Sequence, residues 1–240
     1  MAERADQRST EVTFTYRWYR EFLNGLRSAG YEVGPVAEGI DDGRIVLRHD
    51  VDLSLEAAVT MARIEANLGV SSTYCVLLSS PLYNAHTGTS RDAIRQIESL
   101  GHEVALHFST HEYWPESEPP EGELRERVET ELSVLDTLTD GPTETVSFHI
   151  PPSWVLDRPF ESFDSTYSPE LFGDVGYVSD SVQRWREKPP AVEDIPERAQ
   201  ILTHPGLWDR RELREPGRDG RGRHLPRRAP QSPRGVSRAG

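Results

Sequence analysis

The sequence predicts an α/β fold built on a parallel sheet, and three observations support this. Short apolar segments alternate with longer segments in which apolar residues recur at helical spacing. This strand, helix, strand order favours right-handed crossovers, which bring the carboxyl ends of the strands to one edge of the sheet. Histidines and aspartates directly follow several apolar segments, which is where enzymes with parallel sheets hold their reactive groups.

Helix and strand signals follow one another along the chain in a regular order. Tyr16, Tyr19 and Phe22 recur at helical spacing in the first helix, and Ser54 and Ser90 are suited to cap the second and third. The expected helices span residues 16–29, 55–68, 91–100 and 121–138. The expected strands span residues 45–47, 72–78, 103–106, 146–148, 177–178 and 200–202.

The length of 240 residues suits one catalytic domain with a substantial core. We expect a disordered N-terminus at 1–12, a catalytic domain at 13–208, and a disordered tail rich in Arg, Gly and Pro at 209–240. Out-of-frame translation of a GC-rich gene is an alternative origin for this tail. Because the tail has no aromatic residue to stack on a base, we expect no nucleic-acid partner.

Charges are divided unevenly along the chain. Residues 1–208 carry 17 basic and 36 acidic side chains, and Lys188 is the only lysine in the sequence. A body rich in carboxylates and poor in lysine indicates a halophilic protein, in which salt screens the self-repulsion. A GC-rich genome is an alternative cause of the excess of arginine over lysine.

The apolar stretches are too short for a membrane span, and the charged residues 1–6 lack the apolar run of a secretory signal. We therefore expect a soluble, cytoplasmic protein. Cys75 is the only cysteine, so the chain forms no internal disulfide, and we assign its thiol no catalytic role.

Three polar motifs predict a metal-dependent hydrolase. His107 and His111 are spaced to bind one ion, and Asp52 provides an anionic third ligand. Three protein ligands leave an open position for a water molecule, whose pKa the metal lowers. Each motif by itself also suits a structural role, such as a helix cap or a surface histidine pair. Their shared position at strand ends favours the metal site.

Proton transfer is assigned to two further residues. Asp50, two residues before Asp52, is expected to act as the general base for the attacking water. His204 follows the last expected strand and is expected to donate a proton to the leaving nitrogen or oxygen. The predicted reaction is the hydrolysis of an amide or an ester.

These motifs resemble those of the polysaccharide deacetylase family, also called the NodB-homology family of carbohydrate esterases. The resemblance runs from about residue 45 to residue 208. Asp50 and Asp52 look like the family's aspartate pair in a spaced form, the segment from Gly101 to His111 is similar to its metal-binding motif, and the segment around His204 is similar to its final motif.

The resemblance implies a distorted (β/α)7 barrel that removes an acetyl group from an N-acetylated amino sugar or glycan precursor. It also implies a divalent metal ion, with Zn²⁺ expected first and Co²⁺ or Ni²⁺ as alternatives. The family's third motif commonly has an arginine that orients the base, and this chain has His149 there instead. We expect His149 or Arg184 to replace that arginine and Asp180 to steady the orienting group.

Four residues are expected to bind substrate. By resemblance, Trp185 lines the sugar groove and Leu202 forms part of the acetyl-methyl pocket, and Tyr83 and Asn84 are placed to contact a sugar ring. Two other functions stay open. One is the hydrolysis of another non-peptide C–N bond, as in a cyclic imide or a ureide, and the other is glycan binding without catalysis.

Overall fold

The computed structural model describes residues 14–115 and 117–208. The segments at 1–12 and 209–240, which we expect to be disordered, lie outside the described residues. Within the described residues, no helix is both long enough and apolar enough to cross a bilayer.

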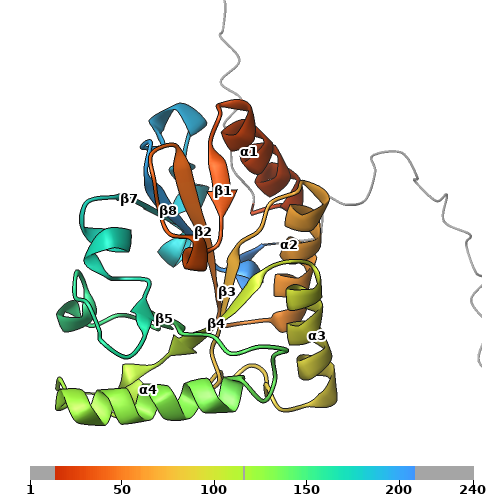
Figure 1. The fold of residues 1–240 in the computed structure, drawn as a ribbon. Helices are drawn as coiled ribbons and strands as arrows, with labels where there is room; N and C mark the ends of the chain where they lie inside the picture. Colours follow the sequence, from red (N-terminus) through yellow and green to blue (C-terminus); the bar gives the residue numbers. More distant parts are fainter. Residues whose placement is uncertain (1–13, 116, 209–240) are drawn as a thin grey trace, which may run out of the picture.

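One parallel sheet organises the described part of the chain (Figure 1). Seven of its strands lie in the order β6-β5-β4-β3-β2-β8-β7, and β1 pairs with β2 beside this path. All of these pairings are parallel, which confirms the prediction of an α/β fold. The strands are β1 (Glu32–Gly34), β2 (Arg44–Val51), β3 (Thr73–Val76), β4 (Glu103–Phe108), β5 (Thr145–Phe148), β6 (Asp164–Ser165), β7 (Gly176–Ser179) and β8 (Ala199–Thr203).

α-Helices connect successive strands only between β2 and β5. α1, α2 and α3 lie along one flank, and α4 runs across the lower end in the view of Figure 1. Helices α2, α3 and α4 are crossovers between successive strands from β2 to β5, whereas short helical turns and loops join β5 to β8. The helices are α1 (Tyr16–Ser28), α2 (Leu55–Asn67), α3 (Gly88–Ser99) and α4 (Glu121–Leu135).

The N-terminal ends of α2 and α3 lie at capping residues of the sequence, and the second of these caps differs from the prediction. Ser54 caps α2 as expected, since its hydroxyl accepts a hydrogen bond from the backbone N–H of Ala57 at 3.2 Å. Helix α3 begins three residues earlier than expected, because Thr87 caps it and accepts from the N–H of Ser90. Ser90 therefore lies inside the helix. Gly101 follows α3 with a φ of 91°, which glycine adopts readily.

The sheet curls into a half-barrel, and side chains fill its interior. The amide of Gln200, in β8, donates to the carbonyl oxygens of Thr166 at 2.9 Å and Leu171 at 2.8 Å. Both acceptors follow β6, which lies at the opposite end of the strand order. No ladder joins β6 to β7 among the described strands, so side-chain contacts close this side of the barrel. This confirms the expected distorted (β/α)7 barrel.

Candidate active site

The predicted motifs meet at the carboxyl edge of the sheet, at the point where the strand order reverses. From β2 the chain adds strands on one side as far as β6, and then returns to place β8 on the other side. Ligands of open parallel sheets bind beside such a reversal. Strand β2 extends to Val51, further than predicted, so Asp50 lies within the strand rather than in the following loop.

Three side chains form a group suited to a metal ion. Asp52, His107 and His149 each offer one ligand atom, and these atoms lie within 4.8 Å of one another. Asp52 Oδ1 lies 3.1 Å from His107 Nε2 and 3.7 Å from His149 Nδ1. This buried carboxylate oxygen has no hydrogen-bond partner, and coordination to a metal ion would satisfy it instead. The donor set therefore fits a divalent ion of the zinc type.

Charge at this group also suits a cation. Burial by itself would raise the pKa of Asp52, but its contacts with His107 and His149 lower that pKa below its usual range. The Asp52 carboxylate is therefore ionised at neutral pH, in the form in which it coordinates metals.

The structure does not bring His111 to this group. The side chain is exposed, and its Nε2 lies 3.0 Å from the carbonyl oxygen of Ile150. Strand β4 continues to Phe108 and a short 3₁₀ turn begins only at Thr110, so His107 and His111 lie on elements with different directions. His149, which directly follows β5, takes the third position instead.

Arg48 holds Asp50, the predicted base, whereas the sequence predicted His149 or Arg184 for this role. Its guanidinium is fully buried and donates from Nη2 to Asp50 Oδ2 at 3.1 Å. Arg184 is exposed and donates to the carbonyl oxygen of Ser181. The spacing of the two residues could have predicted this contact. Residues two apart on a strand share a face, so Arg48 and Asp50 both point into the barrel.

Three other groups hold the Arg48 guanidinium in place. Nη1 donates to Thr166 Oγ1 at 2.6 Å and to Gln200 Oε1 at 3.0 Å, and Nη2 donates to the hydroxyl of Tyr167 at 2.9 Å. Burial would raise the pKa of Asp50, but Arg48 and His107 lower it. Asp50 is therefore a carboxylate able to accept a proton.

His204 forms a hydrogen-bonded pair with Asp180. His204 Nδ1 lies 2.5 Å from Asp180 Oδ1, and Asp180 Oδ2 accepts from the backbone N–H of His204 and from Trp208 Nε1. This fixes the imidazole with Nε2 toward the site, 3.9 Å from Asp52 Oδ2. Burial would lower the pKa of His204, but Asp180, Asp50 and Asp52 raise it. The protonated form is thus favoured, as a general acid requires.

A pocket with a volume of about 480 Å³ opens above these groups. Asp50, Asp52, His107, His149 and His204 lie on its wall, and Leu202 lines it as predicted. These five side chains therefore share one cavity of a size typical for small-molecule ligands.

Three of the predicted substrate contacts lie elsewhere. Trp185 is buried in the core, where its ring lies 5.8 Å from Trp18 and 5.9 Å from Phe22. The hydroxyl of Tyr83 donates to the carbonyl oxygen of Val51, and Asn84 Oδ1 accepts from the N–H of His86. Trp185 therefore packs in the core, and the side chains of Tyr83 and Asn84 form hydrogen bonds with the backbone.

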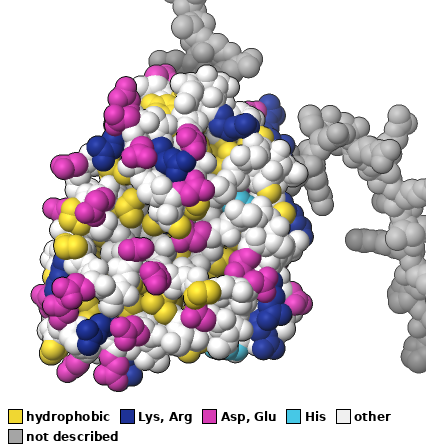
Figure 2. All heavy atoms as spheres, in the orientation of Figure 1, with side chains coloured by type: hydrophobic (Ala, Val, Ile, Leu, Met, Phe, Trp, Pro, Cys, Tyr) yellow, Lys and Arg dark blue, Asp and Glu magenta, His cyan; other side chains and the backbone are white. Residues whose placement is uncertain are grey.

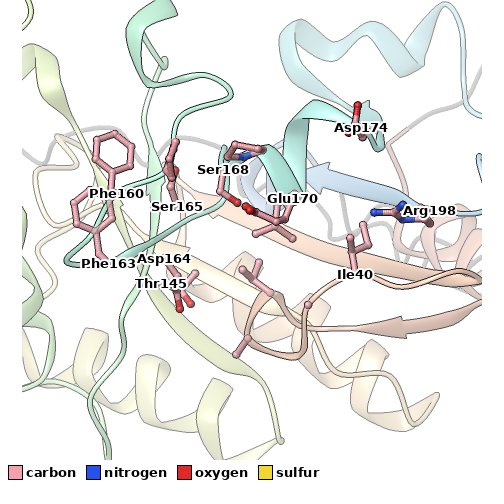
Figure 3. Close-up of a pocket in the computed structure, with 16 residues that line it drawn as sticks. Ile40, Thr145, Phe160, Phe163, Asp164, Ser165, Ser168, Glu170, Asp174 and Arg198 are labelled. Carbon is pink, nitrogen blue, oxygen red and sulfur yellow. The ribbon is translucent and has the colours of Figure 1, made fainter.

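A larger cavity, of about 650 Å³, lies at the opposite edge of the sheet (Figure 3). Thr145 and Asp164, which begin β5 and β6, lie on its wall. Phe160 and Phe163 line one end of it, and Arg198 lies near Asp174 at the other (Figure 3). Within the described residues, the only metal-type group found is at the carboxyl edge, so the smaller pocket is the candidate site.

Comparison with known proteins gives likenesses of structure alone. No protein-family model and no curated protein matches the sequence. Thirteen chains of solved structures match. An acetyl xylan esterase of family 4 from Clostridium thermocellum, in complex with a cobalt ion, has 16% identity and a TM-score of 0.42, and the match covers 67% of this chain and 73% of the esterase.

Two further matches are of the same kind. The chitin deacetylase from Colletotrichum lindemuthianum has 15% identity and a TM-score of 0.46, with 72% of this chain and 78% of the deacetylase covered. A CE4 family pseudoenzyme from Bacillus anthracis has 16% identity and a TM-score of 0.41, with 67% of this chain covered. The match spans about half of that pseudoenzyme, 54% of its length. These values are low, so the chemistry of this chain has to be inferred from its own residues.

Proposed function

We propose that the chain is a metal-dependent hydrolase that removes an acetyl group from an N-acetylated amino sugar or glycan precursor. The main support is the group of Asp52, His107 and His149, which lies beside Asp50 and His204 in one pocket. The acetylated sugar is proposed from the resemblance of the sequence motifs to the polysaccharide deacetylase family.

Asp52, His107 and His149 would hold the ion. One carboxylate and two imidazoles suit Zn²⁺ and also accommodate Co²⁺ or Ni²⁺. When bound, such an ion polarises the carbonyl group of the scissile bond and lowers the pKa of a water molecule.

The other residues of the site move the protons. Asp50, held by Arg48, accepts a proton from the attacking water as the water oxygen bonds to the carbonyl carbon. His204 donates its Nε2 proton to the amine nitrogen as the C–N bond breaks, and Asp180 stabilises the imidazolium before the transfer. The products are acetate and the free amine.

The buried arginine favours catalysis over glycan binding without turnover. That alternative was suggested by the absence of an arginine from the third motif. Arg48, in β2, places its guanidinium 3.1 Å from the Asp50 carboxylate. The proposed base is therefore oriented without an arginine in the third motif. Hydrolysis of a cyclic imide or a ureide uses the same groups and would release no acetate.

The ligand set is tested by metal content, measured by elemental mass spectrometry on the native chain and on single variants. We expect about one ion per chain in the native protein and after His111→Ala, and loss of the ion after His149→Ala. Loss with His111→Ala and retention with His149→Ala would restore the ligand set that spacing predicted. A folded native chain that takes up no ion from added zinc salt would contradict the metal-dependent mechanism.

The reaction is tested by acetate release from N-acetylglucosamine derivatives. We expect Asp50→Asn to abolish release while the metal content stays unchanged, because Asp50 is not one of the three grouped ligands. Exposed Asp174, outside the pocket, provides the matched control, and Asp174→Asn should keep full activity.

A further inference from the structure

The walls of the active-site pocket are apolar wherever they do not belong to the reaction centre. The charged and imidazole groups on the wall are all members of the site described above. The rest of the lining is formed by aliphatic and aromatic side chains and by one serine, Ser181.

Hydroxyl groups on this wall already have partners. The Tyr167 hydroxyl accepts from Arg48 Nη2 at 2.9 Å, and Ser181 Oγ lies 2.5 Å from Ser179 Oγ. The hydroxyl of Tyr177 interacts with Tyr167 and Arg48. The hydroxyl groups of a sugar ring would lose water on entering this part of the pocket and find few side-chain partners, which disfavours binding.

Apolar side chains also gather at the mouth of the pocket. Of the six large apolar side chains exposed in the described residues, four line this pocket. They are Leu53, Ile150, Tyr177 and Val182, with 37%, 67%, 37% and 89% of their surface exposed. Exposed apolar groups that concentrate around one opening mark a binding surface.

Two of these mouth residues have an unfavourable backbone conformation. Ile150 has a φ of 47° and Val182 a φ of 52°, in the left-handed region that β-branched residues rarely adopt. Such strain persists only where the surrounding structure imposes it, and it is concentrated at functional sites. Here it holds two apolar side chains beside the opening.

We infer that the substrate has an extended apolar group, a hydrocarbon chain or an aromatic ring, next to the bond that is hydrolysed. This inference rests on the proposed hydrolase function and names its substrate class more closely. The pocket has far more apolar wall than the methyl group of an acetate requires. The apolar group has two possible positions, in the acyl chain or in the group attached to the sugar, and the experiment separates them.

The test has two substrate arms. One compares N-acetyl, N-butyryl and N-octanoyl glucosamine, and the other compares methyl, octyl and naphthyl glycosides of N-acetylglucosamine. We expect kcat/KM to rise about two- to fourfold for each methylene buried, in whichever arm extends the group that the pocket binds. No rise in either arm, with full activity on unmodified N-acetylglucosamine oligomers, would overturn the inference and leave the proposed function intact.

Binding separates failure of the inference from failure of the proposed function. Calorimetric titration of the same compounds into the Asp50→Asn variant measures affinity without turnover. Affinity that rises with chain length supports the apolar pocket even if the native chain hydrolyses none of the compounds, which would reject the hydrolase. Affinity that is independent of the apolar group contradicts the inference.

Two variants locate the effect. Ile150→Asn together with Val182→Asn removes the apolar mouth while asparagine tolerates the left-handed backbone, so the gain with chain length should fall at least severalfold. Leu82→Asn is the matched control, because Leu82 is 62% exposed and lies outside this pocket. If both variants lose the gain with chain length equally, the gain would come from nonspecific apolar contacts on the surface and not from this pocket.

Discussion

At the scale of single residues, the candidate active site contains a buried charge pair. Arg48 has no exposed surface and Asp50 is 3% exposed. Burying two charges is costly unless each has hydrogen bonds that replace water. The two Nη groups of the flat guanidinium meet this condition with their donations to Asp50, Thr166, Gln200 and Tyr167, whereas its buried Nε has no hydrogen-bond partner. An ammonium group at this position would lack the geometry to contact all four.

Replacement of Arg48 by methionine should destabilise the fold as well as the site. Removing one partner of a buried pair leaves an uncompensated charge, which costs about 3–5 kcal/mol in the free energy of unfolding. We expect this loss for Arg48→Met in urea titrations. Asp50→Asn removes the charge that Arg48→Met leaves unpaired. The double variant should therefore recover part of the stability and none of the activity.

Arg44 provides the matched control at the other end of β2. Its guanidinium pairs with Glu32 and Glu38, whose side chains are 69% and 51% exposed. Exposed partners of this kind contribute about 0–1 kcal/mol. A loss for Arg44→Met as large as that for Arg48→Met would show that the Asp50 pair has no special role.

At the scale of elements, Glu65 links α2 to its neighbours behind the site. Its buried carboxylate accepts hydrogen bonds from Tyr19 of α1 at 2.5 Å, from Ser72 at 2.6 Å and from Tyr74 of β3 at 3.0 Å. His49 Nε2, in β2, lies 3.0 Å from Glu65. His49 Nδ1 lies 2.7 Å from the hydroxyl of Thr203, the residue before His204. This network therefore joins β2, which holds the proposed base, to β8, which leads to the proposed acid.

Stability should depend on pH through Glu65. Burial would raise its pKa, but His49, His102 and Ser72 lower it from 4.5 to about 2. A carboxylate whose pKa is lower in the folded state stabilises the fold above the unfolded value and loses this effect as pH falls. We expect the stability difference between the native chain and Glu65→Gln to be full above pH 4.5 and to shrink between pH 4.5 and about 2.

Urea titrations from pH 2 to pH 7 measure this difference. Glu126→Gln, on the exposed face of α4, should change stability by no more than about 0.5 kcal/mol at any pH. A Glu65→Gln protein whose stability follows the native curve with a constant offset would show that Glu65 does not titrate between these limits.

At the scale of the whole molecule, the chain carries an excess of acidic charge. The chain has 40 acidic and 27 basic residues, a formal net charge of −13. Carboxylates are spread over the face in Figure 2, with fewer basic groups among them. Charges of one sign at this density repel one another, and the repulsion opposes the compact state.

Salt should therefore stabilise the fold. Raising KCl from about 0.1 M to 1 M shortens the screening length from about 10 Å to about 3 Å and weakens the repulsion between carboxylates. We expect the free energy of unfolding, measured by urea titration, to rise over this range at pH 7. The gain should be smaller near pH 5.1, the isoelectric point, where the net charge vanishes. A flat response at pH 7 would favour a GC-rich genome as the source of the arginine bias.

The sequence by itself determined the class of fold and most of the residues that line the candidate site. Helical spacing and strand-like segments are local properties, and parallel crossovers send strand ends to one edge whatever the details of packing. Asp50, Asp52, His107 and His204 therefore meet in one pocket as their positions after apolar segments predicted. Asp180 was expected to steady the group that orients the base, but its carboxylate instead holds the imidazole of His204.

Only the tertiary structure decided which neighbours complete the site. Arg48 is separated from Thr166 by 118 residues and from Gln200 by 152, and the curl of the sheet brings them together. The same curl places His149 rather than His111 beside Asp52, and a packed cluster of rings draws Trp185 into the core. Local sequence patterns predict the face of an element on which a side chain lies. The contacts it makes there depend on how distant elements pack.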